Sequence, residues 1–321
     1  MKRVISLVLL AIASIATGPL AVAQSIAENE TLAEIPYRLR YQGWITVDAT
    51  VNGLGPYHFI VDSGATITSA FENLARYQAF TPADREDIRI LGLTGAKALP
   101  AYNLGTIDFG GARLENHVGV LLPDWLPPNT PPQGVLGLDF LSRYKVHIDA
   151  NYRLIRLYES GGDARPSSKG WSRTNLKPIS ISDKAMPLHT VKVQVRGSYI
   201  PCIVDLGASG TIFNTAALRA MMAGIRVNMN RSTMSTGSRI NDIFENTARV
   251  RPIKITRLRL GNAIWRNKIF LVYDAPIFKE LGKSSRPFCL LGADLFTDRS
   301  IMFDFEDEKL YIGPVRGPTT G

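Results

Sequence analysis

Val61-Asp62-Ser63-Gly64-Ala65-Thr66 is the most informative segment of the chain, because Val204-Asp205-Leu206-Gly207-Ala208-Ser209 repeats its pattern 143 residues later. In each copy an apolar run ends at an aspartate, and a glycine follows two positions on. A strand that ends at the aspartate presents the carboxylate at its tip, and glycine lets the chain turn with its backbone amides close to that carboxylate. The sequence therefore predicts the same strand and turn twice.

Two further blocks repeat in the same order. Residues 135–141 and 290–296 each place a glycine inside an apolar run, and residues 146–158 and 301–312 each read as two strands joined by a polar turn. Both pairs of blocks are separated by 155 residues, so the second half carries 12 extra residues before its second block. Loops absorb such insertions, and three blocks in one order predict two homologous lobes.

Apolar alternation predicts a mostly β chain with one or two short helices in each lobe, including helices at residues 71–78 and 214–222. The chain has 321 residues, enough for two lobes with separate cores. The expected organisation is a signal peptide at 1–23, an N-terminal lobe at 31–158, a linker at 159–175, a C-terminal lobe at 176–313 and a tail at 314–321.

The first 23 residues are typical of an export signal. Lys2 and Arg3 precede an apolar run at 4–16, and small residues at 21–23 suit cleavage after Ala23. The apolar run is shorter than the roughly 20 residues that cross a bilayer. A periplasmic or secreted protein without stable membrane insertion is expected.

The distribution of charged residues, histidines and cysteines argues against a nucleic-acid-binding protein and against a metalloprotein. The formal charge is +9, or +7 without Lys2 and Arg3. The cations at 249–259 alternate along apparent strands as a solvated face would, so no nucleic-acid partner is expected. The four histidines lack metal-ligand spacing, and two cysteines are too few for a thiolate site, so neither a metal nor a cofactor is expected.

The two aspartates suggest a chemistry. If the loops face each other, Asp62 and Asp205 lie close enough to share one proton, because two carboxylates that close cannot both ionise. The ionised group then takes a proton from a water and the neutral group polarises a carbonyl, which gives hydrolysis without a covalent intermediate. Thr66 and Ser209 each place a hydroxyl four positions beyond an aspartate, where it could donate to the carboxylate.

Residues 61–66 followed by 135–141 closely resemble the Asp-Thr/Ser-Gly-Ala-Ser/Thr signature and the downstream apolar-apolar-Gly strand of retropepsin-like aspartic proteases. The second copy makes the chain look like a fused duplication, as in the bilobal pepsins, over residues 37–313. The resemblance implies two β-barrel-like lobes, an extended polypeptide substrate and a monomer with internal pseudo-two-fold symmetry. It implies the catalytic pair Asp62 and Asp205, with a supporting turn of Ser63, Gly64, Thr66, Gly207 and Ser209.

One position departs from that family. Its members normally carry Thr or Ser after each aspartate, and the two hydroxyls brace the loops; Ser63 fits, but Leu206 has no hydroxyl. An asymmetric aspartic endopeptidase is the first interpretation. A catalytically inactive peptide-binding protein is the alternative, and a subunit active only as a dimer is disfavoured because one chain already supplies both carboxylates.

The resemblance also implies a hairpin flap that closes over the substrate. Candidate flaps are residues 91–104, with Gly92 and Gly95, and residues 234–243; ordinary surface hairpins are the alternative. In that fold Cys202 and Cys289 fall on neighbouring strands. A disulfide in the second lobe and two buried thiols both remain open.

Overall fold

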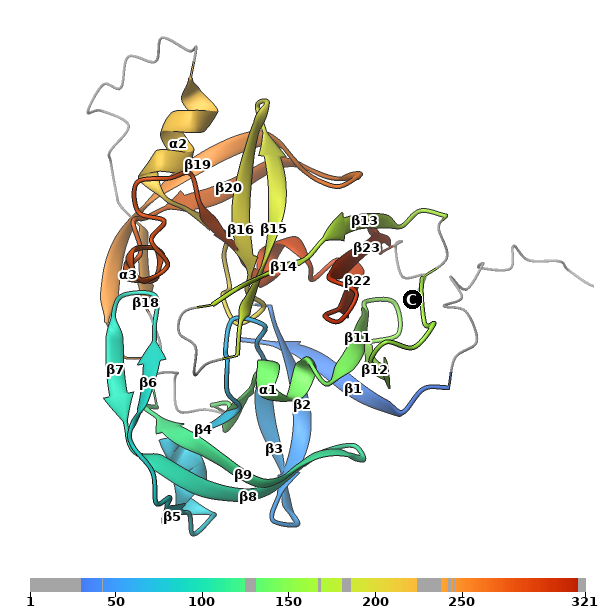
Figure 1. Cartoon of the computed structure of the whole chain (residues 1–321), viewed down its shortest axis with the longest axis vertical. Coiled ribbons are helices and arrows are strands. Elements are labelled where there is room, and N and C mark those ends of the chain that lie inside the picture. The colour runs from blue at the N-terminus through green and yellow to red at the C-terminus, as the bar shows by residue number, and fades with distance from the viewer. Residues whose placement is uncertain are drawn as a thin grey trace, which may run out of the picture.

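The chain folds into two barrels joined by a third sheet (Figure 1). The structure is a computed structural model. It describes residues 30–41, 43–124, 131–166, 169–180, 186–223, 238–241, 244 and 246–316. The mostly β, bilobal retropepsin-like class predicted from the sequence is correct.

The N-terminal barrel has six strands and closes because its first strand, β2, also pairs with its last, β8. Inward-facing side chains of these strands form a continuous apolar core. The strands, in their order around the barrel, are β2 (Trp44–Val51), β3 (Leu54–Val61), β10 (Gly134–Leu136), β4 (Ser69–Phe71), β9 (Ala112–Leu122) and β8 (Ala101–Phe109).

The C-terminal barrel has the same design and closes through the pairing of β15 with β19. Its strands in order are β15 (Leu188–Val195), β16 (Ser198–Val204), β21 (Cys289–Leu291), β17 (Ile212–Phe213), β20 (Ala263–Val272) and β19 (Thr247–Leu260). Two edge strands extend this sheet, β14 (Lys177–Ile179) and β18 (Ser238–Asn241). Each copy of the sequence repeat therefore folds into one barrel.

The sheet between the lobes joins the last strands of each repeat, where β11 pairs antiparallel with β22. A buried ion pair ties the lobes there, with Lys145 Nζ 2.7 Å from Asp304 Oδ2. The strands in order are β13 (Ser172–Asn175), β23 (Lys309–Val315), β22 (Arg299–Asp304), β11 (Tyr144–Asp149), β12 (Leu154–Glu159) and β1 (Ala33–Arg40), and β1 continues into the first barrel by pairing with β2.

Helices are short and lie beside the strand ends. The described helices are η1 (Glu72–Arg76), α1 (Leu138–Leu141), α2 (Thr215–Met222), α3 (Pro276–Glu280) and η3 (Ala293–Leu295). The predicted helix at 214–222 is confirmed as α2, with the Asn214 side chain accepting from the Ala217 amide at 2.7 Å. The one predicted at 71–78 is the 3₁₀-helix η1.

Some sequence-predicted segments differ from the observed elements or lie outside the described residues. The predicted linker at 159–175 is not irregular to its end, because residues 172–175 form β13, and β23 runs two residues into the predicted tail. The predicted signal peptide and its cleavage after Ala23 lie outside the described residues, as do the last five residues of the tail. Within the described ranges, no helix combines the length and apolarity needed to span a membrane.

Candidate active site

Parallel strand pairs position the two aspartates. β3 runs parallel to β10 and β16 runs parallel to β21, so each aspartate leaves its strand beside the end of the neighbouring strand, where Gly137 or Gly292 follows. The Asp62 amide donates to Leu136 O and the Asp205 amide to Leu291 O, both at 2.9 Å. The two lobes thus hold their aspartates in matching frames.

Backbone amides orient each carboxylate. Asp62 Oδ1 accepts from the Gly64 amide at 2.7 Å and the Ala65 amide at 3.1 Å. Asp205 Oδ1 accepts from the amides of Gly207 and Ala208, both at 3.0 Å. The turn predicted from the sequence therefore forms in both lobes.

The two carboxyl groups face each other across the lobe interface. They share a hydrogen bond, and each packs against the glycine of the opposite loop. A Cβ atom at Gly64 would lie 2.5 Å from Asp205 Cγ, and one at Gly207 would overlap the Asp62 carboxylate. Glycine is therefore required at both positions to let the opposite carboxyl group approach.

Burial changes the acidity of the pair. Both carboxyl groups lie among protein atoms and open only to the cleft, so burial raises the pKa of Asp62 and raises that of Asp205 well above its usual range. The Asp62 charge raises the pKa of Asp205 further, because two carboxylates in contact repel each other. At intermediate pH the pair holds one proton between two acidic groups.

Ser63 links the lobes at the base of the pair. Its hydroxyl donates to Val204 O at 2.9 Å and accepts from the Leu206 amide at 3.1 Å, both in the opposite lobe. Leu206 occupies the equivalent position in the second loop, where it is buried in the apolar core. The hydroxyl brace between the loops is therefore one-sided.

A second polar network, which the sequence interpretation missed, supports each loop from behind. Thr68 Oγ1 donates to Asp139 Oδ1 at 2.7 Å, and Thr211 Oγ1 donates to Asp294 Oδ1 at 2.8 Å. The same hydroxyls accept from the amides of Gly137 and Gly292, which follow β10 and β21, at 3.0 and 3.1 Å. Burial raises the pKa of Asp294 to about 6.

The hydroxyl groups of Thr66 and Ser209 are not where the sequence interpretation expected them. Thr66 and Ser209 line the cleft, and the hydrogen bonds found for the carboxylates in the described structure come from backbone amides and from the partner carboxyl group. The predicted donation from these two hydroxyls is therefore wrong. The side chains four positions beyond each aspartate turn toward the cleft, and those six positions beyond turn inward.

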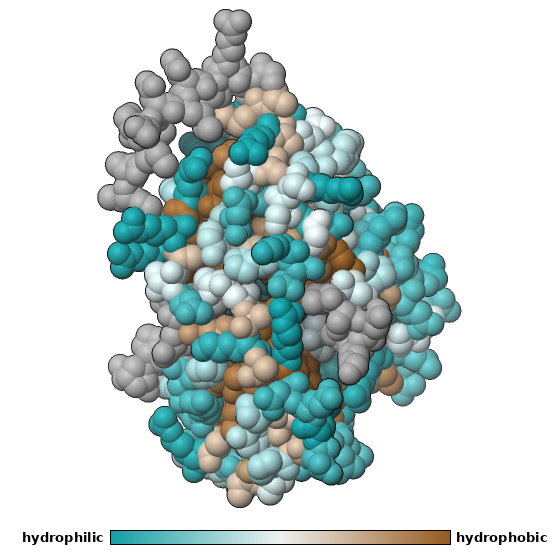
Figure 2. All heavy atoms as spheres, turned by 60° about the vertical axis from the view of Figure 1, so that its left-hand side comes forward, coloured by the Kyte–Doolittle hydropathy of each residue, from teal (hydrophilic) through white to brown (hydrophobic). Residues whose placement is uncertain are grey.

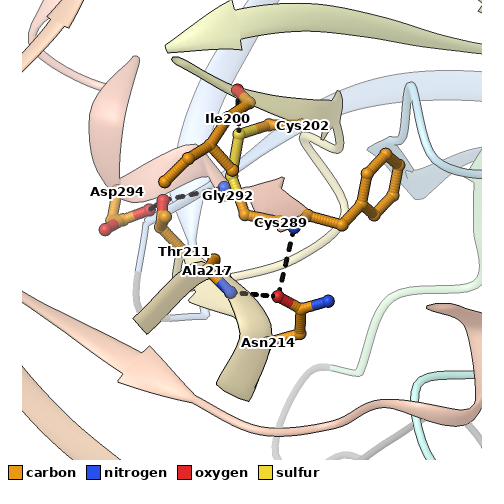
Figure 3. The surroundings of a disulfide bond; sticks show 9 residues. Ile200, Cys202, Thr211, Asn214, Ala217, Cys289, Gly292 and Asp294 are labelled. Atoms are coloured by element: carbon orange, nitrogen blue, oxygen red, sulfur yellow. Dashed lines mark hydrogen bonds between the residues drawn. A yellow bond between two sulfur atoms is a disulfide. The ribbon is translucent and has the colours of Figure 1, made fainter. Parts of the chain in front are cut away.

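Cys202 and Cys289 form a disulfide between β16 and β21, where they are directly paired (Figure 3). The bond lies three residues before Asp205. Around it, Asn214 caps α2 and also accepts from the Phe288 amide at 3.1 Å. The strand that carries Asp205 is thus covalently fixed to its neighbour.

The pair lies in a cleft of about 300 Å³ between the lobes. Aliphatic side chains from both barrels make most of its wall, and Arg89 is the only other charged residue lining it among the described residues. Figure 2, in which the left-hand side of Figure 1 comes forward, shows hydrophobic residues exposed between the hydrophilic residues of the surface. Such a cleft suits an apolar ligand held by few polar groups.

A hairpin crosses the cleft opening. It consists of β6 (Ile88–Leu91) and β7 (Ala96–Leu99), joined by a turn in which the Gly92 amide donates to Gly95 O at 2.7 Å. It reaches the other lobe through a 3.1 Å ion pair from Arg89 to Glu280 in α3 and through Leu93, which packs on the apolar cluster around Phe278.

The predicted flap at 91–104 thus has the right turn but wrong limits, since residues 101–104 already belong to β8. Of the second candidate, at 234–243, the structure describes only β18, which pairs with β19 and brings Ile240 to the cleft. The short strand β5 (Thr81–Pro82) pairs with β8 at the edge of the sheet.

In the comparison with known proteins, the first lobe matches a family model. Residues 47–140, which run from β2 to α1, match the model of a family described as aspartyl protease. The predicted resemblance to retropepsin-like aspartic proteases is therefore confirmed over this region, which contains Asp62 and its supporting turn. No curated protein matches the chain. The likeness of the C-terminal lobe rests on its barrel and on the repeated loop around Asp205.

Proposed function

From the match to aspartyl proteases over residues 47–140, we propose that this chain is an aspartic endopeptidase that uses Asp62 and Asp205 together. The observation that carries the proposal is the shared hydrogen bond between two carboxyl groups with raised pKa values at the floor of a peptide-sized cleft. A pair that holds one proton supplies a base and an acid at the same point.

The carboxyl pair supports a division of labour. The group that keeps the shared proton donates a hydrogen bond to the scissile carbonyl oxygen. The other group, which is ionised, takes a proton from a water held between the two carboxyl groups. That water attacks the carbonyl carbon while the neutral carboxyl group gives its proton to the carbonyl oxygen. The proton taken from the water then passes to the amide nitrogen, the C–N bond breaks, and a hydroxyl of the intermediate returns a proton to the pair, which releases an amine and a carboxylic acid.

The surroundings suit a peptide in extended conformation. The β6–β7 hairpin covers the cleft and exposes strand edges to which a peptide can add its own backbone hydrogen bonds. Closure of such a hairpin excludes water from the carboxyl pair. The proposed substrate is therefore an unfolded or flexible polypeptide segment.

A peptide-binding protein without catalysis is the second candidate, and Leu206 is the observation that favours it. With this residue the second loop has no hydroxyl to return the brace made by Ser63. A missing neutral hydrogen bond costs about 1 kcal/mol, which packing of buried Leu206 can offset. We therefore rank the enzyme first.

Incubation of the chain with a denatured-protein mixture from acidic to neutral pH tests the proposal. The parent should cleave, and Asp62→Asn and Asp205→Asn should each lose activity by at least about a thousandfold, because either change removes the shared proton. Asp163→Asn, in a side chain that is 90% exposed, is the matched control and should cleave like the parent. Equal cleavage by all variants, or binding of peptides without cleavage, would refute the enzyme.

A further inference from the structure

Ile67 and Gly210 occupy the same position in the two lobes. They are separated by 143 residues, as are Asp62 and Asp205. A Cβ atom at Gly137 would lie 2.7 Å from the carbonyl carbon of Ile67, and one at Gly292 would lie 2.6 Å from that of Gly210. Because both backbones pack on equivalent glycines and both residues line the cleft, they are structural counterparts.

The fold does not require glycine at position 210. Its φ lies outside the left-handed region, and a Cβ atom there would meet only Leu271 Cδ1, at an ordinary contact distance of 3.8 Å. Gly207 and Gly292 differ, because a Cβ atom at either would collide with neighbouring atoms. The missing side chain at 210 therefore changes the space in the cleft and little else.

The residues beneath these two positions differ as well. Ser69 and Ile212 are counterparts, each 2% exposed, and both contribute to the cleft wall. On the C-terminal side, the space beside Gly210 has an apolar floor of Ile212 and Leu271. On the N-terminal side, Ile67 lines the cleft at the position equivalent to Gly210, and Ser69 contributes a hydroxyl that donates to Ile67 O at 3.4 Å.

We propose that the cleft has two unequal subsites, whose selectivity is set by Gly210 on one lobe and Ile67 on the other. The C-terminal-lobe subsite accepts a large apolar side chain, such as Phe, and the N-terminal-lobe subsite accepts a small one, such as Ala or Ser. This inference rests on the proposed function only in requiring an extended peptide in the cleft. It also gives that peptide a preferred binding direction, with the bulky residue on one side of the carboxyl pair.

Binding of peptides that cannot be hydrolysed tests this without relying on catalysis. Four peptides carry a central reduced-amide bond and place one Phe, in turn, at the two positions on each side of that bond, with Ala elsewhere. The parent should bind one of the four about tenfold or more tightly than the mirror-placed peptide, since filling or blocking an apolar pocket changes selectivity by that order. Fluorescence titration measures the four affinities.

Exchange of the two side chains should move the preference. Gly210→Ile should abolish the preferred Phe position, Gly210→Ala should weaken it partly, and Ile67→Gly should create a second Phe position on the opposite side of the bond. The double variant Ile67→Gly/Gly210→Ile should keep only that second position. Thermal unfolding of each variant checks that the fold is retained.

The outcomes separate the two proposals. Equal affinity for all four peptides, no binding of any peptide by the parent, or an unchanged preference in folded Gly210→Ile would overturn the unequal subsites. Selective binding that moves with the exchange, together with no cleavage of the ordinary amide peptides, would refute the enzyme and leave the subsites standing. Cleavage without any position preference would do the reverse.

Discussion

Among single residues, Ser63 is the one whose hydroxyl links the two lobes at the base of the carboxyl pair. It is 3% exposed and makes two hydrogen bonds to the other lobe, one to a carbonyl and one from an amide. Its counterpart, Leu206, contributes apolar packing at the same level. One lobe therefore supplies the polar link and the other supplies the hydrophobic contact.

Ser63→Ala should lower the free energy of unfolding by about 1–3 kcal/mol, because it leaves Val204 O and the Leu206 amide buried without their partner. The same change should reduce kcat more than it raises KM, since the loops lose their fixed spacing. Urea unfolding and peptide cleavage measure the two effects. Ser63→Thr keeps the hydroxyl and should retain most of both; equal stability of the Ala variant and the parent would show that the brace contributes nothing.

The sequence predicted the aspartates and their glycines because their spacing repeats, but it did not give side-chain directions. Thr66 and Thr68 are both near Asp62 in sequence, and only the structure shows that Thr68 turns inward to Asp139, 71 residues away. Residues 135–141 contain Asp139 and repeat in the second lobe as residues 290–296. Those repeated aspartates were the available signal for the network that the sequence interpretation missed.

At the scale of elements, the two lobes fill the same strand contact in different ways. In the C-terminal lobe Cys202 pairs with Cys289 on parallel strands and forms the disulfide. In the N-terminal lobe the equivalent pair is Phe59 and Gly134, where the aromatic ring covers the glycine so closely that a Cβ atom would overlap it. Cysteine count alone left this open, because pairing depends on strand register.

Cys202→Ala/Cys289→Ala should lower the stability of the chain by about 2–5 kcal/mol, since the bond closes a loop with a sequence separation of 87 residues in the unfolded chain. Guanidinium unfolding with and without a reductant measures this. The parent midpoint should fall when reductant is present, and the double variant should be indifferent to it. If the disulfide of the parent is fully reduced in the unfolded chain and the midpoint of guanidinium unfolding does not change, the bond does not stabilise the fold.

The ends of the two flap strands could not be predicted from the sequence. Gly92 and Gly95 marked the turn correctly, but the hairpin strands begin at Ile88 and end at Leu99 because β8 takes Ala101 onward into the barrel. Competition between a two-stranded hairpin and a barrel strand is decided by tertiary pairing. The outcome therefore cannot be predicted from local sequence alone.

At the scale of the whole molecule, the sheet between the lobes repeats the pseudo-two-fold relation. Asp149 and Asp304 are counterparts, 155 residues apart, and each contacts a side chain of the other lobe. Asp304 pairs with Lys145, and Asp149 accepts from Ser300 Oγ at 3.4 Å. Breaking a buried ion pair by removing one partner is costly, so these contacts resist separation of the lobes.

Two groups of buried residues give the folded molecule opposite responses to acid. The carboxyl pair has raised pKa values, so its contribution favours the folded state as the pH falls and is lost as the pH rises through those values. His147 and His189 act in the opposite sense, because burial lowers the pKa of each to about 4. Both ring nitrogens of His147 are buried, and neither has a hydrogen-bond partner among the described residues.

Stability should therefore fall between pH 6.5 and pH 4 on account of the histidines. Above that window each imidazole is neutral in both states; within it the unfolded chain binds a proton that the folded chain does not. His147→Leu should reduce the stability lost between pH 7 and pH 4.5 by roughly 2–3 kcal/mol, from a folded pKa of about 4 against an unfolded value of about 6.5. Urea unfolding at the two pH values measures the difference.

His189→Leu provides the matched comparison, since the same lowered pKa occurs on β15 in the C-terminal barrel, a different sheet from that of His147. It should produce a loss of acid sensitivity of the same order, and the double variant should approach the sum, because the two side chains lie on separate elements. If both single variants lost as much stability as the parent on acidification, neither imidazole would be neutral in the folded chain. The acid response would then belong to carboxylates such as Asp149, whose pKa is lowered chiefly by its hydrogen bond from Arg156 against the opposing effect of burial.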